Sequence, residues 1–183
     1  MSRIVFLSLA LVLGSPVVVA ESAALDTVEF VDLERYLGTW FEIASYPAWF
    51  QKNCTASTAE YSMRDDGAIQ VINRCRKGGL DGKPKTSKGK ATVVDRETNA
   101  KLKVSFFWPF KGNYWIIDLD DDYRWVVVGE PKRKYLWILS RSAQMDEATY
   151  GAILSRLPEM GYDPAKLNLT AQPSENSSGQ SPE

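Results

Sequence analysis

Apolar residues recur at every second position along most of the chain after residue 38, which is the period of a half-buried β-strand. Segments rich in β-branched and aromatic residues alternate with turn clusters, a spacing typical of an all-β sandwich or barrel. Eight such segments suit a closed, antiparallel up-and-down β-barrel, a size that either packs solid or holds one small ligand. The expected strands cover residues 38–46, 55–63, 68–75, 88–94, 101–107, 113–119, 123–129 and 135–141.

Helical spacing is convincing in one place, after residue 141. We expect an α-helix that begins at Met145 or Asp146 and ends before Pro158. Its apolar stripe has to be covered, so the helix is expected to pack on the outside of the barrel. A single helical turn is expected over residues 31–37, and an extended segment over 162–170.

The connections between the expected strands alternate between short and long. Compact turns are expected at 64–67, 96–99 and 118–122. Longer connections are expected at 47–53, 76–87, 108–112 and 130–134. Because every second connection of a meander lies at the same end, one end of the barrel should be closed and the other should be an open mouth.

The period of two also predicts which side chains point into the barrel. Phe41 and Ile43 are expected to point outward, under the helix, while Ala59, Met63 and Ile69 point inward. An aromatic-lined interior with phenols and an amide is the lining of a ligand pocket, although side chains that fill the barrel completely are the alternative. The expected ligand-binding residues are Tyr61, Val71, Asn73, Leu102, Val104, Phe106, Trp108, Tyr114, Ile116, Tyr135, Trp137 and Leu139.

Three residues are expected to form the barrel floor. Gly38 and Trp40 open the first strand, and Arg141 ends the last strand at the same end of the barrel. A guanidinium over the indole face would seal an apolar cavity, and such a contact stabilises by roughly 0.5–2 kcal/mol. The alternatives are an ordinary core tryptophan and a solvated arginine.

The two ends of the chain differ from the barrel in composition. Residues 1–20 contain Arg3, an apolar run and small residues near Ala20, as in an export signal; a cut after Ala24 is also possible. The barrel domain is expected over residues 21–172. Residues 173–183 are rich in Ser, Gly, Gln and Pro and are expected to be disordered. These patterns predict an exported protein, periplasmic or secreted, and soluble.

Cys54 and Cys75 fit one disulfide in an oxidising compartment, with two free buried thiols as the alternative. The strand phases of the two residues differ, so the bond requires a bulge near Cys54. The chain contains no histidine, which removes imidazole acid–base chemistry and histidine-ligated metal sites. We therefore expect no cofactor, no metal site and no catalytic residue.

The charged residues are divided between the two ends of the expected barrel. Cations prevail in the mouth connections and acids in the closed-end turns, a pattern that attracts anionic ligands or an anionic lipid surface unless the charges are paired locally. Trp49, Phe50 and residues 108–110 are apolar groups at the rim, which line the opening, touch a membrane or anchor their loops. Nucleic-acid binding is disfavoured, because the lysines lie in connections rather than along a strand face.

Gly38-Thr39-Trp40-Phe41-Glu42-Ile43-Ala44, the acidic run 120–122 followed by Tyr123, and the strand ending in Arg141 together resemble the three signature regions of the lipocalins. The likeness is greatest to the bacterial lipocalins and apolipoprotein D and covers essentially all of residues 28–170. The resemblance implies a carrier of a fatty acid or lysophospholipid with a role in cell-envelope lipid storage, transport or stress. Typical bacterial members have an acylated cysteine at the mature N-terminus, and no cysteine follows the apolar run here.

A second functional class is weighed against the carrier. Glu42 has the inward phase of its strand, and a buried carboxylate is able to act as a general acid or base. The alternative is therefore a small exported carboxylate-dependent hydrolase or isomerase on the same barrel. It lacks a second inward carboxylate, so the carrier is the favoured hypothesis.

Overall fold

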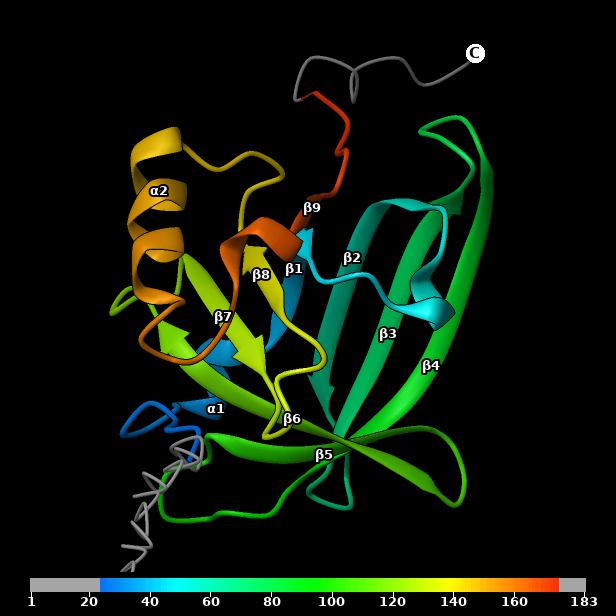
Figure 1. Ribbon diagram of the computed structural model, residues 1–183. Helices are drawn as coiled ribbons and strands as arrows, with labels where there is room; N and C mark the ends of the chain where they lie inside the picture. Colours follow the sequence, from blue (N-terminus) through cyan, green and yellow to red (C-terminus); the bar gives the residue numbers. More distant parts are fainter. Residues whose placement is uncertain (1–23, 175–183) are drawn as a thin grey trace, which may run out of the picture.

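Eight antiparallel strands curl into a closed barrel because the first strand pairs with both the second and the eighth (Figure 1). The structure, a computed structural model, describes residues 24–174. The strand order is β2-β3-β4-β5-β6-β7-β8-β1-β9, with the additional β1–β2 pairing. The strands are β1 (Gly38–Ser45), β2 (Cys54–Met63), β3 (Ile69–Lys77), β4 (Lys83–Val93), β5 (Lys101–Phe107), β6 (Phe110–Leu119), β7 (Trp125–Gly129), β8 (Trp137–Ser140) and β9 (Asn168–Leu169).

The expected eight-stranded barrel is confirmed, and its closing register is set at the start of β1. Gly38 pairs with Tyr61 and Phe41 with Thr58 on β2, while Phe41 also pairs with Ser140 on β8. Beyond Phe41 strands β1 and β2 part, and the C-terminal segment enters there. The expected extended segment supplies β9, which pairs with β1 at Ala44 and Ser45.

Two of the expected mouth connections are wrong. Strands β3 and β4 continue through most of 76–87 and leave only a short turn between Lys77 and Lys83. Strand β6 begins at Phe110, so the β5–β6 connection consists of Trp108 and Pro109, joined by a cis peptide bond. The extra strand residues of β4 are polar and exposed on both faces. They show no alternation of apolar and polar positions, which is why the pattern did not reveal them.

Helix α2 (Glu147–Arg156) covers one outer face of the barrel, as expected (Figure 1). Asp146 caps it by accepting a hydrogen bond from the backbone N–H of Thr149. Ile153 and Leu157 are fully buried against outward-facing residues of the sheet, among them Ile43 as predicted. The short helix α1 (Leu33–Tyr36) precedes β1, and its Asp32 cap accepts from the N–H of Glu34.

The disulfide between Cys54 and Cys75 is present, with the two Cα atoms 5.5 Å apart. Strand β2 has a register shift between Thr55 and Thr58, and Ala56 has a φ of 45°. This is the irregularity that the strand phases required near Cys54. Closing a loop of this length stabilises a fold by about 3 kcal/mol in the chain-entropy model, and the bond joins β2 to β3 close to the mouth.

The expected export signal (1–20) and the greater part of the expected tail (173–183) lie outside the described residues. Within residues 24–174, no helix has the length and apolar character needed to cross a membrane. The described part of the chain also contains no cluster of His, Cys, Asp or Glu side chains able to hold a metal ion.

Candidate ligand-binding site

The barrel floor is built around Trp40, which is fully buried. The guanidinium carbon of Arg141 lies 3.7 Å from the centroid of the Trp40 ring, and the indole N–H donates to the carbonyl of Tyr36 at 2.9 Å. Gly38 has a φ of +93°, which places the first residue of β1 within contact of the guanidinium. The three expected floor residues therefore lie together at the closed end.

Arg141 also joins the backbone segments that meet at the floor. Its guanidinium donates to the carbonyl oxygens of Thr39 (2.9 Å), Arg35 (2.6 Å), Tyr36 (3.2 Å) and Tyr123 (3.3 Å). Burial lowers the pKa of Arg141 from its usual value, yet a guanidinium stays charged at any physiological pH. The side chain thus holds α1, β1 and the β6–β7 turn against one another.

Three tyrosines form a polar layer above the floor. The Tyr114 hydroxyl lies 2.7 Å from that of Tyr36 and 2.8 Å from that of Tyr61. Burial raises the pKa of Tyr61 to about 12 and raises those of Tyr36 and Tyr114 well above their usual range. All three phenols are therefore neutral donors and acceptors at physiological pH.

Burial along the inward positions divides the barrel interior into two halves. In the floor half, Ile69, Leu102, Ile116 and Val126 pack with Trp40 and exclude solvent almost completely. In the mouth half, the inward side chains of Val104, Phe106, Tyr114 and Trp137 pack against the same cluster but remain partly accessible. The partly accessible inward positions therefore lie on the mouth side of the packed floor half.

The structure brings most of the expected ligand-binding residues together in the interior cluster, along with the expected inward residues Ala59 and Ile69. Tyr135 precedes the first residue of β8, but its ring stacks on that of Trp137, with ring centroids 5.8 Å apart. The residues in the interior cluster are Tyr61, Val71, Leu102, Val104, Phe106, Tyr114, Ile116, Trp137 and Leu139.

Besides Tyr135, three expected inward residues do not belong to this cluster. Trp108 stands at the exposed tip of the β5–β6 hairpin, because β5 ends at Phe107 before its alternation would return Trp108 to the interior. Met63 is exposed at the end of β2, beside the tight turn. Asn73 is exposed where β3 runs towards the mouth, and the burial of this strand is confined to its first residues, Ile69 to Ile72.

An aromatic cluster of Phe50, Tyr135 and Trp137 narrows the mouth. The Phe50 ring lies 5.6 Å from that of Tyr135 and 6.5 Å from that of Trp137, between centroids. The helical turn η1 (Trp49–Gln51) carries Phe50 to this place, and Gln51 fixes the turn by accepting from the Trp137 indole N–H at 3.0 Å. The β1–β2 connection is therefore tied directly to the interior of the barrel.

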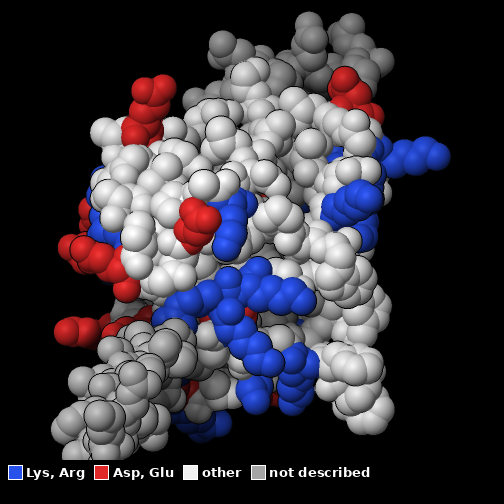
Figure 2. Space-filling model, viewed as in Figure 1, with Lys and Arg blue, Asp and Glu red and all other residues white. Residues whose placement is uncertain are grey.

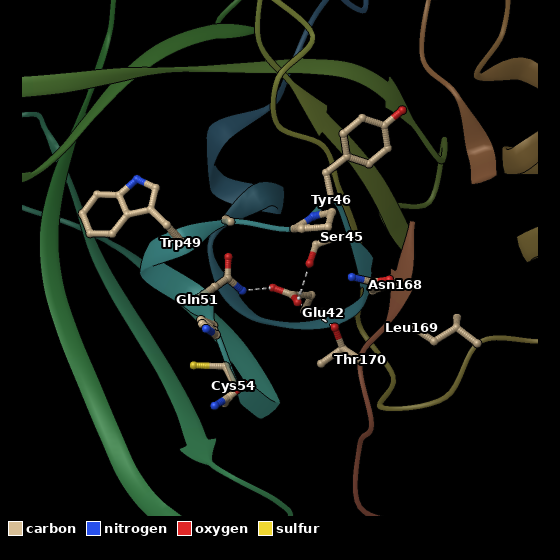
Figure 3. A pocket seen from close by; sticks show the side chains of 13 residues that line it. Glu42, Ser45, Tyr46, Trp49, Gln51, Cys54, Asn168, Leu169 and Thr170 are labelled. Carbon is tan, nitrogen blue, oxygen red and sulfur yellow. Dashed lines mark hydrogen bonds between the residues drawn. The ribbon is translucent and has the colours of Figure 1, made fainter. Parts of the chain in front are cut away.

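Glu42 anchors the same connection from the other side (Figure 3). Its carboxylate accepts hydrogen bonds from Ser45 (3.0 Å), Thr170 (2.6 Å) and the Gln51 amide. These residues line a cleft of about 430 Å³ between the end of β1, η1 and β9. Each oxygen of this buried carboxylate is engaged by a neutral donor, so the group holds three segments together at the seam where β1 and β2 part.

Lysines of β3 and β4 reach across the mouth to the same connection. The Lys77 ammonium donates to the carbonyl of Lys52, and that of Lys85 donates to the carbonyl of Phe50 at 3.3 Å. These are bonds to neutral groups, so both charges remain uncompensated. Figure 2 shows Lys and Arg gathered in a band across the middle of the viewed face, with acids mainly along its left side.

Three of the acids expected at the closed end are paired closely with cations in the structure. Asp120 binds the guanidinium of Arg124 through both oxygens, and this contact holds the pKa of its carboxyl below the usual value. Asp118 pairs with Arg156 at 2.7 Å. Asp66 pairs with Arg64 and Lys90. The pairing reduces the negative charge of the closed end at these three positions.

Sequence reasoning missed several residues that shape the site. Tyr36, four residues before Trp40, was a recognisable aromatic on the helical turn but was not connected with the interior. Gly89 faces the ring of Phe106, which a Cβ at position 89 would meet at 2.8 Å. Gln51 and Thr170 lie in connections, where no period indicates their direction, so only the three-dimensional structure links them to Glu42.

A closed barrel with a sealed floor, an aromatic-rich apolar interior and a mouth narrowed by aromatic side chains is typical of small-ligand-binding β-barrel proteins. A family model described as the lipocalin-like domain matches residues 31–172. The chain therefore belongs to the lipocalin family. Among solved structures, insecticyanin from the tobacco hornworm Manduca sexta matches with a TM-score of 0.67 at 20% identity, covering 85% of this chain and 87% of that one.

Relatives come from plants, bacteria and animals. Temperature-induced lipocalin-1 of Arabidopsis thaliana is 41% identical over 160 residues, which are 83% of this chain and 85% of that protein. The outer membrane lipoprotein Blc of Escherichia coli K12 is 42% identical over 142 residues, 78% of this chain and 80% of that one. Apolipoprotein D of Macaca fascicularis is 30% identical over 151 residues, with 79% and 78% covered.

Proposed function

We propose that this lipocalin carries a single-chain lipid, a fatty acid or lysophospholipid, in the mouth half of its barrel. The observation that carries the proposal is the partial exposure of inward-facing Val104, Phe106 and Trp137 above a floor that is fully packed. Each CH₂ group of an acyl chain gains about 0.8 kcal/mol on burial. A long chain therefore binds with micromolar affinity or better after ordering costs of several kcal/mol.

The ligand is expected to bind with its acyl chain downward and its anionic head at the mouth. The bottom of the accessible space is the tyrosine layer, whose phenols are already hydrogen-bonded to one another. The mouth instead presents the ammonium groups of Lys77 and Lys85, which contact only carbonyl oxygens. A carboxylate or phosphate placed there gains charge-assisted hydrogen bonds.

The proposed setting is outside the cytoplasm, in the periplasm or a secreted fluid, with a role in envelope lipid storage, transport or stress. The Cys54–Cys75 disulfide supports an oxidising compartment. The likeness to an outer membrane lipoprotein supports a place at the cell envelope.

We propose that the protein is a carrier and not an enzyme. The candidate for acid–base chemistry was Glu42, and its carboxylate is occupied by Ser45, Gln51 and Thr170. A Glu42→Gln variant should therefore bind lipid like the parent chain, or lose affinity only through loosening of the β1–β2 connection. Loss of a measurable turnover on an ester or lipid substrate in this variant would instead favour the hydrolase.

Titration of the delipidated protein with a fluorescent fatty acid tests the carrier proposal. Saturable quenching of tryptophan emission is expected, and Trp137→Phe should remove a large part of it because this indole faces the accessible interior. Trp125→Phe is the matched control, since Trp125 packs in the outer cluster beneath α2. Absence of a saturable signal, or equal loss of quenching in both variants, would contradict the proposed site.

A further inference from the structure

Large apolar side chains are exposed on the connections that surround the mouth. Trp108 is 89% exposed, Trp49 82%, Phe107 78% and Phe110 77%. Phe50 and Leu80 are exposed to a smaller extent, near 40%. Exposed aromatic groups gathered in one region of a protein mark an interaction surface. We call these six residues the rim.

The rim occupies three separate connections rather than one loop. Trp49 and Phe50 lie on η1, Leu80 on the β3–β4 turn, and the remaining three residues on the β5–β6 hairpin. Figure 1 shows these connections one above the other along the right-hand side of the view, around the barrel opening. A planar partner can therefore touch all three connections at once.

Cations accompany the apolar groups on each connection. Lys52 follows η1, Lys83 follows the β3–β4 turn and Lys111 follows Phe110. In the described part of the chain, none of these three forms an ion pair. Aromatic side chains flanked by unpaired lysines are the composition that binds the interface of an anionic bilayer.

We propose that the barrel mouth docks on an anionic phospholipid bilayer, with the rim inserted at the headgroup level and the lysines against the lipid phosphates. Charge favours this partner over a second copy of the chain, because an isologous contact through the rim would bring the lysines of both copies together. In the docked orientation the accessible interior opens towards the lipid. The inference goes beyond lipid carriage and stands on the exposed rim alone.

Flotation with vesicles tests the docking. The chain should float with vesicles of phosphatidylcholine and phosphatidylglycerol in equal amounts, and much less with phosphatidylcholine alone. High salt should weaken the association because it screens surface charges. The Phe107→Ser, Phe110→Ser double variant should bind at least about tenfold more weakly, since two apolar side chains lose their transfer into the interface.

Matched controls lie away from the mouth. Phe30, 58% exposed ahead of α1, and Val94, 53% exposed in the β4–β5 turn, are replaced by serine as the apolar control and should leave flotation unchanged. Lys111→Glu should lower binding to the anionic vesicles by about fivefold, whereas Lys88→Glu on the barrel wall should have a smaller effect. Emission from Trp108 should shift to the blue on docking.

Three results would overturn the docking proposal: no flotation of the parent chain, equal flotation of the double variant, or equal loss in the Phe30 and Val94 control. Fatty-acid titration of the Phe107→Ser, Phe110→Ser variant distinguishes failure of membrane docking from failure of lipid carriage. Retained fatty-acid binding with lost flotation supports a docking surface distinct from the ligand site. Loss of both fatty-acid binding and flotation would show that the rim residues maintain the ligand site rather than contact a membrane, and would overturn the inference.

Discussion

The two halves of one barrel obey the same alternation of side chains but differ in what fills the interior. In the floor half, Trp40 and its neighbours are almost completely buried, and Arg141 ties the converging segments together through carbonyl oxygens. In the mouth half, Phe106 and Trp137 remain partly accessible, and hydrogen bonds such as that from the Trp137 indole N–H to Gln51 hold the connections. The difference suits a division of labour in which the floor half supplies stability, and it supports the proposal that the mouth half binds the ligand.

The largest expected contrast is between two tryptophans. Trp40→Ala removes a fully buried ring from the floor and should lower the free energy of unfolding by about 3–5 kcal/mol. Trp108→Ala removes an exposed ring from the mouth and should change it by less than about 0.5 kcal/mol. Urea unfolding followed by circular dichroism measures both. Equal effects would show that the two halves do not divide the stability as described.

Two arginines give the next contrast. Arg141→Met keeps much of the side-chain volume but leaves up to four carbonyl groups without their donor, so a loss of about 2–4 kcal/mol in unfolding free energy is expected. Arg74→Met breaks an exposed ion pair with Glu60 and should cost at most about 1 kcal/mol. Thermal unfolding at matched pH compares them, and a similar loss in both variants would argue against the special role of Arg141.

Replacing a valine by tryptophan should have different consequences in the two halves of the barrel. Val126→Trp overpacks the floor half and should lower the free energy of unfolding by about 1–3 kcal/mol. Val104→Trp extends into the accessible half, so the fold should be retained while fatty-acid affinity falls about tenfold, since the ring occupies space that the acyl chain needs. Parallel unfolding and fatty-acid titrations separate the two effects. If Val104→Trp destabilises as much as Val126→Trp, the mouth half is packed rather than hollow.

The tyrosine layer between the halves predicts a smaller effect at alkaline pH. Burial raises the pKa of Tyr61 in the folded protein to about 12, from 10.0. As the pH rises through this interval, the unfolded chain releases a proton that the folded chain keeps, so stability is full below pH 10 and declines above it. The parent chain should lose about 1 kcal/mol more per pH unit than Tyr61→Phe. Parallel losses in both chains would show that water reaches the phenol.

The sequence allowed the floor half to be predicted well. Alternation identified the strands, Gly38 with Trp40 marked the start of β1, and the antiparallel course of the last strand brought Arg141 to the same end. Packing in this half excludes water, so every inward position has to be apolar and the period of two is strong. The outer cluster followed for the same reason, because Ile43 and the stripe of α2 cover one another.

The mouth half could not be predicted as completely. Where water lies on both sides of a strand, as along the first residues of β4, polar residues serve at every position and the alternation disappears. Trp108 was placed in the interior because strand phase was continued past Phe107, where the chain turns instead. The bonds of Glu42 to Gln51 and Thr170 join residues far apart in sequence, which no local pattern records.

The most direct test of lipid binding in the mouth half is native mass spectrometry. The delipidated chain is incubated with palmitate and its mass is then measured. The account predicts a single palmitate bound per folded chain, with the adduct strongly reduced in Val104→Trp and unchanged in Trp108→Ala. A folded chain that retains no palmitate, or retains it equally in the Val104→Trp variant, would contradict it.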